Sequence, residues 1–233
     1  METSTIVIRL YLCCIIICII TGCGFTKPRG DGAGANYTPS NSGLSQLRVS
    51  GNTIINVAGT PIILQGINAI DPLKQSTDIH NYQGAGPFNE TYFATMASWG
   101  ANVVRLPIHP ENWRTTSNAA ALAIIDQAVT WAKNNNMYII IDFHTIGMLS
   151  TGVYEITTYN NYTTDISEVQ SYWQTIATHY KNEPAVAAYE IFNEPINFNN
   201  KTNMADWATW KTDAETIINT IRAIDQQKIV IVG

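Results

Sequence analysis

The sequence has no cysteine after residue 23: its four cysteines are Cys13, Cys14, Cys18 and Cys23. The rest of the chain therefore has neither a disulfide nor thiol chemistry. Charged residues are also few, at 13% of the 233 residues, and the net charge of -5 leaves no basic excess. We therefore expect no nucleic acid partner. No apolar run reaches the roughly 20 residues that a helix needs to span a bilayer.

The N-terminal segment has the pattern of an export signal. Arg9 precedes Leu10–Ile20, an apolar run of a length typical of a secretory signal. The residues Ile20-Thr21-Gly22-Cys23 resemble a bacterial lipoprotein signal, in which the cysteine is lipidated after cleavage. We predict a lipoprotein signal peptide over residues 1–23, with Cys23 lipidated and membrane contact only through the lipid. An ordinary signal peptide or an uncleaved anchor is the alternative, and in each case the protein is exported, to the cell envelope or beyond.

Residues 24–44 are rich in Gly, Pro, Ser, Asn and Thr and have little to bury, so we interpret them as a flexible linker. The folded domain is predicted over residues 45–233, enough for one α/β domain with a sizeable core. It begins with a predicted hairpin of Leu47–Val49 and Thr53–Val57, which could cap the bottom of a barrel. Six Trp and 11 Tyr among few charges suit a secreted protein that handles uncharged polar ligands.

Apolar runs alternate with stretches of helical periodicity along this domain. The candidate strands are Ile62–Asn68, Asn102–Pro107, Tyr138–His144, Val186–Asn193 and Lys228–Val232. The predicted helices between them are Asn118–Asn134, Asp165–Tyr180 and Asn203–Asp225. This alternation indicates an α/β fold with a parallel sheet, either an open doubly wound sheet or a closed barrel.

The connection after the first candidate strand decides between these folds. It contains no G-x-G-x-x-G motif, and residues 68–87 form a long polar loop where a dinucleotide fold needs a tight turn. We therefore predict a (β/α)8 TIM barrel with an N-terminal β-hairpin. Because the sequence stops shortly after the fifth candidate strand, we expect the barrel to be truncated there, with the last βα units absent.

Charged residues recur on one face of three neighbouring strands. Residues two apart in a strand share a side, so Val104 and Leu106 should face the helices. The residues expected to face the barrel axis are Val103, Arg105, Ile140, Asp142, His144, Glu190, Phe192 and Glu194. A buried arginine is costly unless paired, so Arg105 should bond Asp142, Glu190 or both. This pairing alone is better explained as a structural ion network, whereas residues at the strand tips are placed for catalysis.

The residues at the tips, His144 and Glu194, fit the hydrolysis of a glycosidic bond. In that reaction one carboxylic acid protonates the leaving oxygen and another carboxylate acts on the anomeric carbon. Pro195 holds Glu194 at the end of its strand, and Asn193 offers an amide to a sugar hydroxyl. A metal site is the chemical rival, because Asp142, His144 and Glu194 are acceptable ligands. The sequence has no closely spaced histidine pair, so we predict no metal.

Three segments resemble glycoside hydrolase family 5, the cellulase and mannanase family, whose fold is a (β/α)8 barrel. Gly100–Pro107 resembles the family's second strand, with its arginine at Arg105, and Tyr138–His144 resembles the third strand, with its active-site histidine. Asn193-Glu194-Pro195 matches the fourth-strand motif, whose glutamate is the general acid/base and whose asparagine contacts the sugar 2-hydroxyl. The resemblance runs from about Leu47 to Gly233, and the order of all three segments makes it specific.

The resemblance implies a retaining, endo-acting hydrolase of a β-1,4-linked polysaccharide such as cellulose. It implies that Glu194 is the acid/base, Asn193 a substrate-binding amide, and Arg105 and His144 supports of the nucleophile. We add Asn68, at the end of the first candidate strand, to the supporting residues. The family's nucleophile is a glutamate on the seventh strand, which this sequence lacks, so we expect the polypeptide by itself to be inactive. The resemblance implies no cofactor.

Other functions stay open at this point. A β-mannanase or another β-glucanase of the same family is the close alternative. A non-catalytic carbohydrate-binding barrel is the alternative from a different class, and a metal-dependent barrel hydrolase is third. Aromatic and histidine side chains in the loops after the strands could bind sugar. These loop candidates are Trp113, Tyr154, Tyr159, Phe198, His80, Tyr82 and His109.

Overall fold

The computed structural model describes residues 43–74, 88–149, 152–153, 162–196 and 207–233. The predicted signal peptide with Cys23, and most of the predicted linker, lie outside the described residues. So do the loop candidates His80, Tyr82, Tyr154, Tyr159 and Phe198. Within the part of the chain that is described, no helix is both long enough and apolar enough to cross a membrane.

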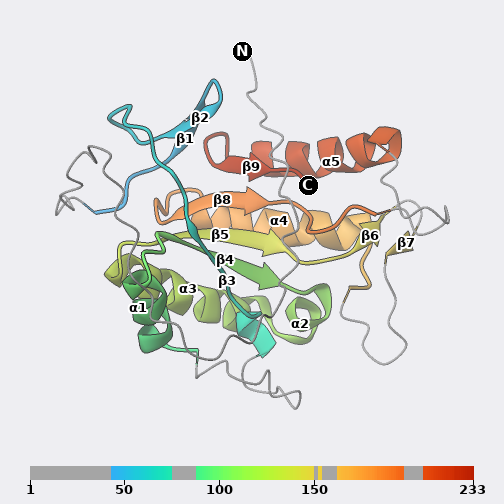
Figure 1. Ribbon diagram of the computed structural model, residues 1–233. Helices are drawn as coiled ribbons and strands as arrows, with labels where there is room; N and C mark the ends of the chain where they lie inside the picture. The colour runs from blue at the N-terminus through green and yellow to red at the C-terminus, as the bar shows by residue number, and fades with distance from the viewer. Residues whose placement is uncertain (1–42, 75–87, 150–151, 154–161, 197–206) are drawn as a thin grey trace, which may run out of the picture.

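A parallel sheet of five strands forms the centre of the domain (Figure 1). Its strands, in spatial order, are β3 (Gly66–Asn68), β4 (Val103–Ile108), β5 (Tyr138–Phe143), β8 (Val186–Glu190) and β9 (Ile229–Ile231). Every neighbouring pair is parallel, and the spatial order follows the order along the chain. A doubly wound sheet instead reverses its strand order at a switch point, so this order favours the predicted barrel.

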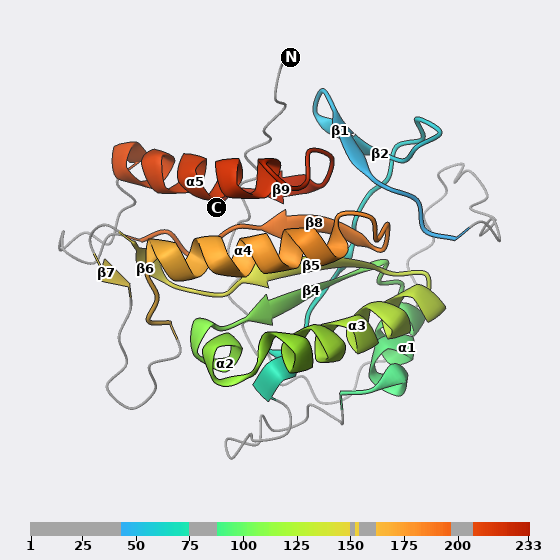
Figure 2. The ribbon, with the colours of Figure 1, turned by 180° about the vertical axis from the view of Figure 1, so that it is seen from behind.

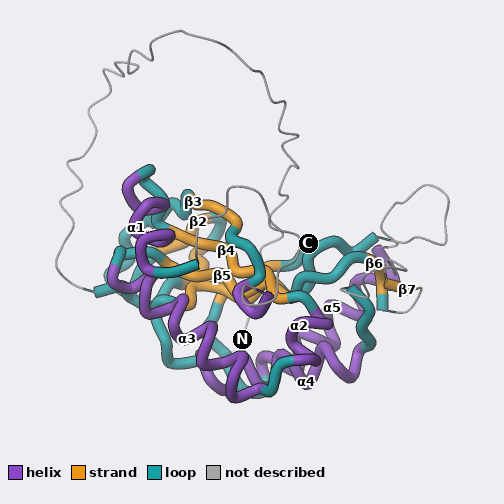
Figure 3. The backbone as a smooth tube through the Cα atoms, turned by 90° about the horizontal axis from the view of Figure 1, so that it is seen from below, coloured by secondary structure: helices purple, strands orange, loops and turns teal. Residues whose placement is uncertain are grey.

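The helices lie on one side of this sheet. They are α1 (Glu90–Ser98), α2 (Pro110–Thr115), α3 (Asn118–Asn134), α4 (Ile166–Tyr180) and α5 (Trp207–Arg222). Figure 2, from behind, shows α3, α4 and α5 in front of the strands, and Figure 3 shows the helices as an arc around them. Sequential parallel strands with helices on one face form part of a (β/α)8 barrel, as predicted.

The two faces of the strands belong to two apolar clusters. Val104 and Leu106 of β4 lie in the cluster between sheet and helices, together with Ile125 of α3 and Trp173 of α4. The cluster on the opposite face consists of Leu47, Val103, Tyr138, Ala187, Ala188, Ile229 and Ile231. The predicted outward and inward faces of β4 are therefore confirmed.

The predicted N-terminal hairpin is present as β1 (Arg48–Ser50) and β2 (Thr53–Ile55). Gly51 in its turn has φ +59°, a conformation that glycine adopts most easily. Leu47 is fully buried in the inward-facing cluster with the first residues of β4 and β5. The hairpin therefore packs at the N-terminal end of the sheet. Leu44, the last residue of the predicted linker, also packs against the core.

Side-chain caps explain where two of the helices begin. α3 has its predicted bounds and follows Ser117, whose hydroxyl accepts a hydrogen bond from the N–H of Ala120. α4 follows Asp165, whose carboxylate accepts from the N–H of Glu168 at 2.9 Å, as the predicted capping-box spacing requires. α5 ends at Arg222, slightly before its predicted end.

Several strands are shorter than predicted, β3 and β8 by the largest number of residues. β3 keeps only the last part of the predicted strand Ile62–Asn68, because its partner β4 begins at Val103. β8 ends at Glu190, and the alternation of faces ends with it. The prediction that Phe192 faces inward is therefore wrong: its ring packs against Trp210 of α5, with 5.2 Å between the ring centroids.

The structure also contains elements that the sequence did not predict. A short antiparallel pair, β6 (Gly147–Met148) and β7 (Gly152–Val153), follows β5, and a 3-10 helix, Pro72–Lys74, follows β3. The helices α1 and α2 were likewise missed. Only Phe93 and Met96 are buried among the 9 residues of α1, so this helix has too weak an apolar periodicity to stand out in the sequence.

Candidate active site

The C-terminal ends of β4, β5 and β8 bring acidic and basic side chains together. In the parallel register Asp142 lies opposite Pro107 on one side and Glu190 on the other. Arg105, two residues before Pro107, shares their inward face. Asp142 is fully buried, and Glu190 is 4% exposed. Each of these charges therefore needs a partner within the protein.

Arg105 supplies most of these contacts. Its Nε and Nη2 donate to the two carboxylate oxygens of Glu190 at 2.7 and 2.8 Å, and Nη2 also lies 2.9 Å from Asp142. Nη1 donates to Asn68 at 2.7 Å, and Nη2 to the Asn193 side chain at 2.8 Å. The predicted pairing is thus confirmed with both carboxylates. Burial by itself would lower the pKa of Arg105, but the acidic neighbours outweigh it and raise that pKa.

Asp142 holds the imidazole of His144, whose Nδ1 lies 2.6 Å from Oδ2 of the carboxylate. Burial raises the pKa of Asp142 to about 7, although Arg105 opposes the shift. Burial, His109 and Arg105 lower the pKa of His144 to about 3. The imidazole is therefore uncharged near neutral pH and bonded at Nδ1, which leaves Nε2 to meet a ligand. The other oxygen of Asp142, Oδ1, is buried without a hydrogen-bond partner in the described structure.

Asn193 and Glu194 lie just beyond β8, where backbone hydrogen bonds tie them to the segment after β5. The N–H of Asn193 donates to Phe143 at 3.2 Å, and the N–H of Glu194 donates to Thr145 at 3.1 Å. The carbonyl of Glu194 accepts from the N–H of Gly147 at 2.8 Å. Glu194 is half-buried, and its charge contributes to the raised pKa values of both Arg105 and Asp142. The carboxylate of Glu194 therefore lies close to Arg105 and Asp142.

A second aspartate–histidine pair lies just after the ends of β3 and β4. His109, one of the loop candidates, has Nδ1 2.9 Å from Asp71, and its ring centroid is 4.6 Å from that of His144. The ring of Tyr162 packs against the imidazole of His109, with 5.4 Å between the ring centroids. The sequence patterns did not indicate Asp71 or Tyr162. Asp71 stands just after a candidate strand, and that position was the available signal.

Two other candidates, Asn68 and Trp113, have structural roles. Asn68 accepts from Arg105 and donates to the carbonyl of Ala69 at 2.9 Å, so both ends of its amide are bonded within the protein. This fits support of Arg105 rather than contact with substrate. Trp113, a candidate for stacking on sugar, is 6% exposed and packs edge-on against Tyr172 with 4.8 Å between ring centroids. Trp113 is therefore part of the core.

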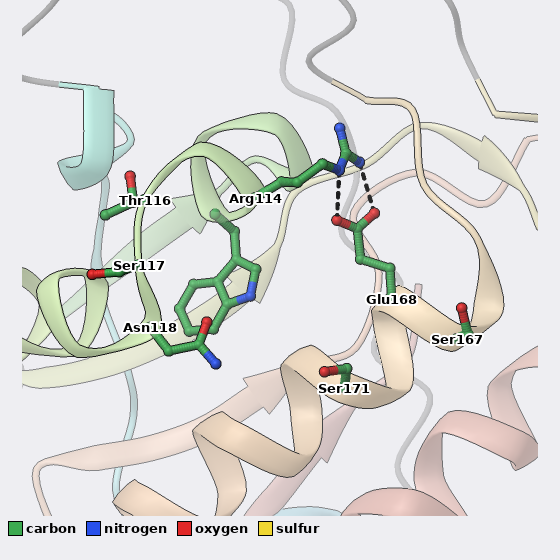
Figure 4. A pocket seen from close by; sticks show the side chains of 8 residues that line it. Arg114, Thr116, Ser117, Asn118, Ser167, Glu168 and Ser171 are labelled. Carbon is green, nitrogen blue, oxygen red and sulfur yellow. Dashed lines mark hydrogen bonds and ion pairs between the residues drawn. The ribbon is translucent and has the colours of Figure 1, made fainter.

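A cavity of about 440 Å³ lies on the helix side of the sheet, between the N-terminal ends of α3 and α4 (Figure 4). Its lining residues are Trp113, Arg114, Thr116, Ser117, Asn118, Ser167, Glu168 and Ser171. Arg114 donates to both carboxylate oxygens of Glu168 at 2.9 and 2.7 Å, as Figure 4 shows. None of the inward-facing residues at the strand ends lines this cavity, so it is separate from the candidate active site.

The chemistry at the strand ends is that of proton transfer and hydrogen bonding. Glu194 can donate or accept a proton, Asn193 and His144 can bond hydroxyl groups, and Arg105 supplies a fixed positive charge. Among the described residues, no group of three or more His, Cys, Asp or Glu side chains is arranged to hold a metal ion.

Comparison with known proteins shows which family the chain resembles. The family described as "Cellulase (glycosyl hydrolase family 5)" matches residues 56–233. An endoglucanase of Clostridium saccharobutylicum is 30% identical over 224 residues, which are 96% of this chain and 43% of that protein. The β-glucanase SdGluc5_26A of Saccharophagus degradans has a similar structure, with a TM-score of 0.71 and 36% identity over 82% of this chain and 55% of that one.

Another similar structure is the catalytic domain of the Thermobifida fusca endoglucanase Cel5A, with a TM-score of 0.57. It is 24% identical over 81% of this chain and 53% of that one, and it supports the fold alone. The chain spans about half the length of these relatives. Since the family match extends over most of the sequence, the chain belongs to the cellulase family, glycosyl hydrolase family 5.

Proposed function

We propose that the protein is an endo-acting β-1,4-glucanase that hydrolyses a polysaccharide such as cellulose with retention of configuration. Its family and the names of its relatives, endoglucanases and a β-glucanase, support this substrate class. A structure of the Saccharophagus degradans β-glucanase contains cellotetraose. The observation that carries the proposal is the position of Glu194 beside Asn193, whose side chain accepts a hydrogen bond from Arg105 at 2.8 Å.

In this mechanism Glu194 acts first as a general acid and then as a general base. Its carboxyl group protonates the glycosidic oxygen while the bond to the anomeric carbon breaks. Its carboxylate then takes a proton from the water that hydrolyses the glycosyl-enzyme intermediate. The backbone hydrogen bonds to Thr145 and Gly147 keep Glu194 at the strand end during both steps.

The nucleophile is a second carboxylate, which the family resemblance places on the seventh strand, beyond the five strands described here. In a retaining enzyme the two carboxyl groups lie roughly 5 to 5.5 Å apart. Arg105 and His144 support the ionised nucleophile. Because Oδ1 of Asn193 is bonded by Arg105, the amide N–H groups of Asn193 are left for the sugar 2-hydroxyl.

Replacement of Glu194 in the full-length protein tests this assignment. With Glu194→Gln, turnover of an unactivated glucan should fall by roughly 10²- to 10⁴-fold or more, because no acid protonates the leaving oxygen. An aryl glycoside with a good leaving group should lose less, since its departure does not need a proton. With Glu194→Ala, azide should restore turnover of the aryl substrate and give the β-glycosyl azide.

The matched control is Glu215→Gln, because Glu215 is an exposed carboxylate of α5 that pairs with Lys211. Turnover by the Glu215→Gln variant should match that of the wild type. Undiminished hydrolysis by Glu194→Gln would refute the assignment. A panel of cellulose and β-mannan separates the glucanase from a β-mannanase of the same family. A protein that binds these glycans and cleaves neither is a carbohydrate-binding barrel.

We propose further that the protein is exported and held at the cell envelope by a lipid on Cys23. The support is the sequence pattern of residues 1–23. Wild-type protein should incorporate labelled palmitate and fractionate with membranes, and Cys23→Ser should do neither. Equal labelling of the two proteins, or labelling of neither, would contradict a lipid at this residue.

A further inference from the structure

Two aspartate–histidine pairs stand side by side at the strand ends. Nδ1 of His109 lies 2.9 Å from Oδ2 of Asp71, and Nδ1 of His144 lies 2.6 Å from Oδ2 of Asp142. His109 follows β4 and His144 follows β5, so the two imidazoles follow adjacent strands of the sheet. The proposed mechanism uses His144 but gives no role to Asp71 or His109.

The two imidazole rings are in contact and reach the same surface. Their centroids are 4.6 Å apart in an edge-to-face arrangement. The side chains of His109 and His144 are exposed to nearly the same small extent, 18% and 19%. The two carboxylates behind them are buried, at 3% and 0% exposure. In each pair, therefore, only the imidazole is exposed at the C-terminal ends of the strands.

Asp71 determines which nitrogen of His109 is available. A carboxylate only accepts hydrogen bonds, so Nδ1 of His109 donates to it. Oδ2 of Asp71, which accepts this hydrogen bond, also accepts from the backbone N–H of His109 at 2.9 Å and from Nδ2 of Asn112 at 2.7 Å. The other oxygen of Asp71, Oδ1, accepts from the N–H of Leu73 at 2.8 Å. Nε2 is the ring nitrogen left to meet a ligand.

The anchoring of the loops does not require this imidazole. The backbone N–H groups of His109 and Leu73 and the side chain of Asn112 already tie Asp71 to the segments after β3 and β4. A ring that served only this purpose would not need to extend to His144 and to solvent. The position of the ring therefore points to a contact outside the protein.

We propose that His109 is a substrate-binding residue whose Nε2 bonds a hydroxyl of the glucan next to His144, and that Asp71 is its positioning residue. A sugar hydroxyl both donates and accepts, so it suits Nε2 in either protonation form of the ring. This inference rests on the proposed function, because it assumes that a neutral glucan crosses the strand ends.

Two amide replacements distinguish the two ring nitrogens. His109→Asn puts an amide nitrogen near the position of Nδ1 and retains the contact with Asp71, but it removes Nε2. His109→Gln extends an amide towards the position of Nε2. In full-length protein carrying Glu194→Gln, calorimetry with cellotetraose should show Kd raised about tenfold by His109→Asn, the effect of one lost hydrogen bond. Tm should not change, and His109→Gln should recover part of the affinity.

Kinetics in otherwise wild-type protein give a second readout. His109→Asn should raise KM for glucan by about the same factor and leave kcat within a few-fold, as expected when ground state and transition state lose the same contact. Asp71→Asn should raise KM by a smaller factor. The KM effects of the two substitutions should be less than additive in the double variant, because Asp71 acts through His109.

The outcomes separate this inference from the proposed function. If His109→Asn leaves both Kd and KM unchanged while the parent protein still cleaves glucan, the role of His109 is refuted and the proposed function stands. Additive KM effects would remove the positioning role of Asp71. A parent protein that neither binds cellotetraose nor cleaves glucan would overturn both proposals.

Discussion

The two faces of the central sheet come from the same strands, yet towards the C-terminal ends of these strands they bury different kinds of side chain. Towards the helices, Val104 and Leu106 are fully buried among apolar residues. On the opposite face, Arg105 lies between them in the sequence and bonds the buried carboxylates of Asp142 and Glu190. Because strand side chains alternate, one short segment encodes core and site together. Substitutions at neighbouring positions should therefore differ in their effect on activity even where both reduce stability.

Loss of the charge at Arg105 should have the largest effect. Arg105→Met leaves Asp142 and Glu190 buried without their cation, which typically costs about 3 to 5 kcal/mol when one partner of a buried pair is removed. Hydrolysis of glucan should also disappear, since Arg105 positions Asn193. Urea unfolding and a glucan assay on the full-length protein measure the two effects. A variant as stable as the wild type would show that the charge network is unimportant for folding.

Truncation of the next residue should affect stability alone. Leu106→Ala removes a fully buried side chain from the helix-facing cluster, and such changes cost about 3 kcal/mol. The protein that remains folded should keep kcat within a few-fold, because Leu106 points away from the site. Active-site titration corrects the assay for unfolded protein. A folded variant without activity would contradict the separation of the two faces.

A helix cap on the outer layer should have a smaller effect. Asp165→Ala removes the carboxylate that accepts the N–H of Glu168, and loss of an N-cap costs about 1 kcal/mol. Thermal unfolding should show the loss, and KM should stay at the wild-type value. Ser117→Ala, at the start of α3, is the matched control and should lose a similar amount. A changed KM would mean that the outer layer adjusts the site.

The pH dependence of stability should show the smallest effect, because two contributions oppose each other. The pKa of Asp142 is raised from 3.8 to about 7, so between these values the folded state binds the proton more tightly and stability falls as pH rises. The pKa of His144 is lowered from 6.5 to about 3, so over that range stability rises with pH. In the wild type the two slopes largely cancel.

Single substitutions should reveal each slope. His144→Gln keeps only the Asp142 contribution, and its unfolding free energy should fall, relative to wild type, as pH rises from about 4 to 6.5. Asp142→Asn keeps only the His144 contribution and should show the opposite slope. Urea unfolding at the two ends of this range measures both. Parallel pH profiles for the three proteins would exclude buried, shifted groups at these positions.

Sequence patterns predicted what depends on local periodicity. The bounds of α3 and the capping of α4 by Asp165 follow from short-range rules, and they are confirmed. The partners of Arg105 could be predicted because strand alternation places Asp142 and Glu190 on its side of the sheet. Strand alternation failed at Phe192, where β8 has already ended and tertiary packing against Trp210 decides the direction.

The contacts that the sequence could not show join residues far apart in the chain. Asp71 and His109 are separated by 38 positions, and no periodicity relates them. Only the pairing of β3 with β4 brings their loops together. The short helix α1 was missed for a different reason, since its few buried residues leave little pattern to detect. The pairing of Asp71 with His109 therefore had to come from the structure.

The most direct test of the account is a crystal structure of the full-length Glu194→Gln protein with cellotetraose. The account predicts that the sugar crosses the strand ends and that the side chain of residue 194 lies within about 3.2 Å of a glycosidic oxygen. Asn193 should bond a hydroxyl of the adjoining sugar. Cellotetraose bound in the cavity between α3 and α4, or a residue 194 side chain that points away from Arg105, would contradict it.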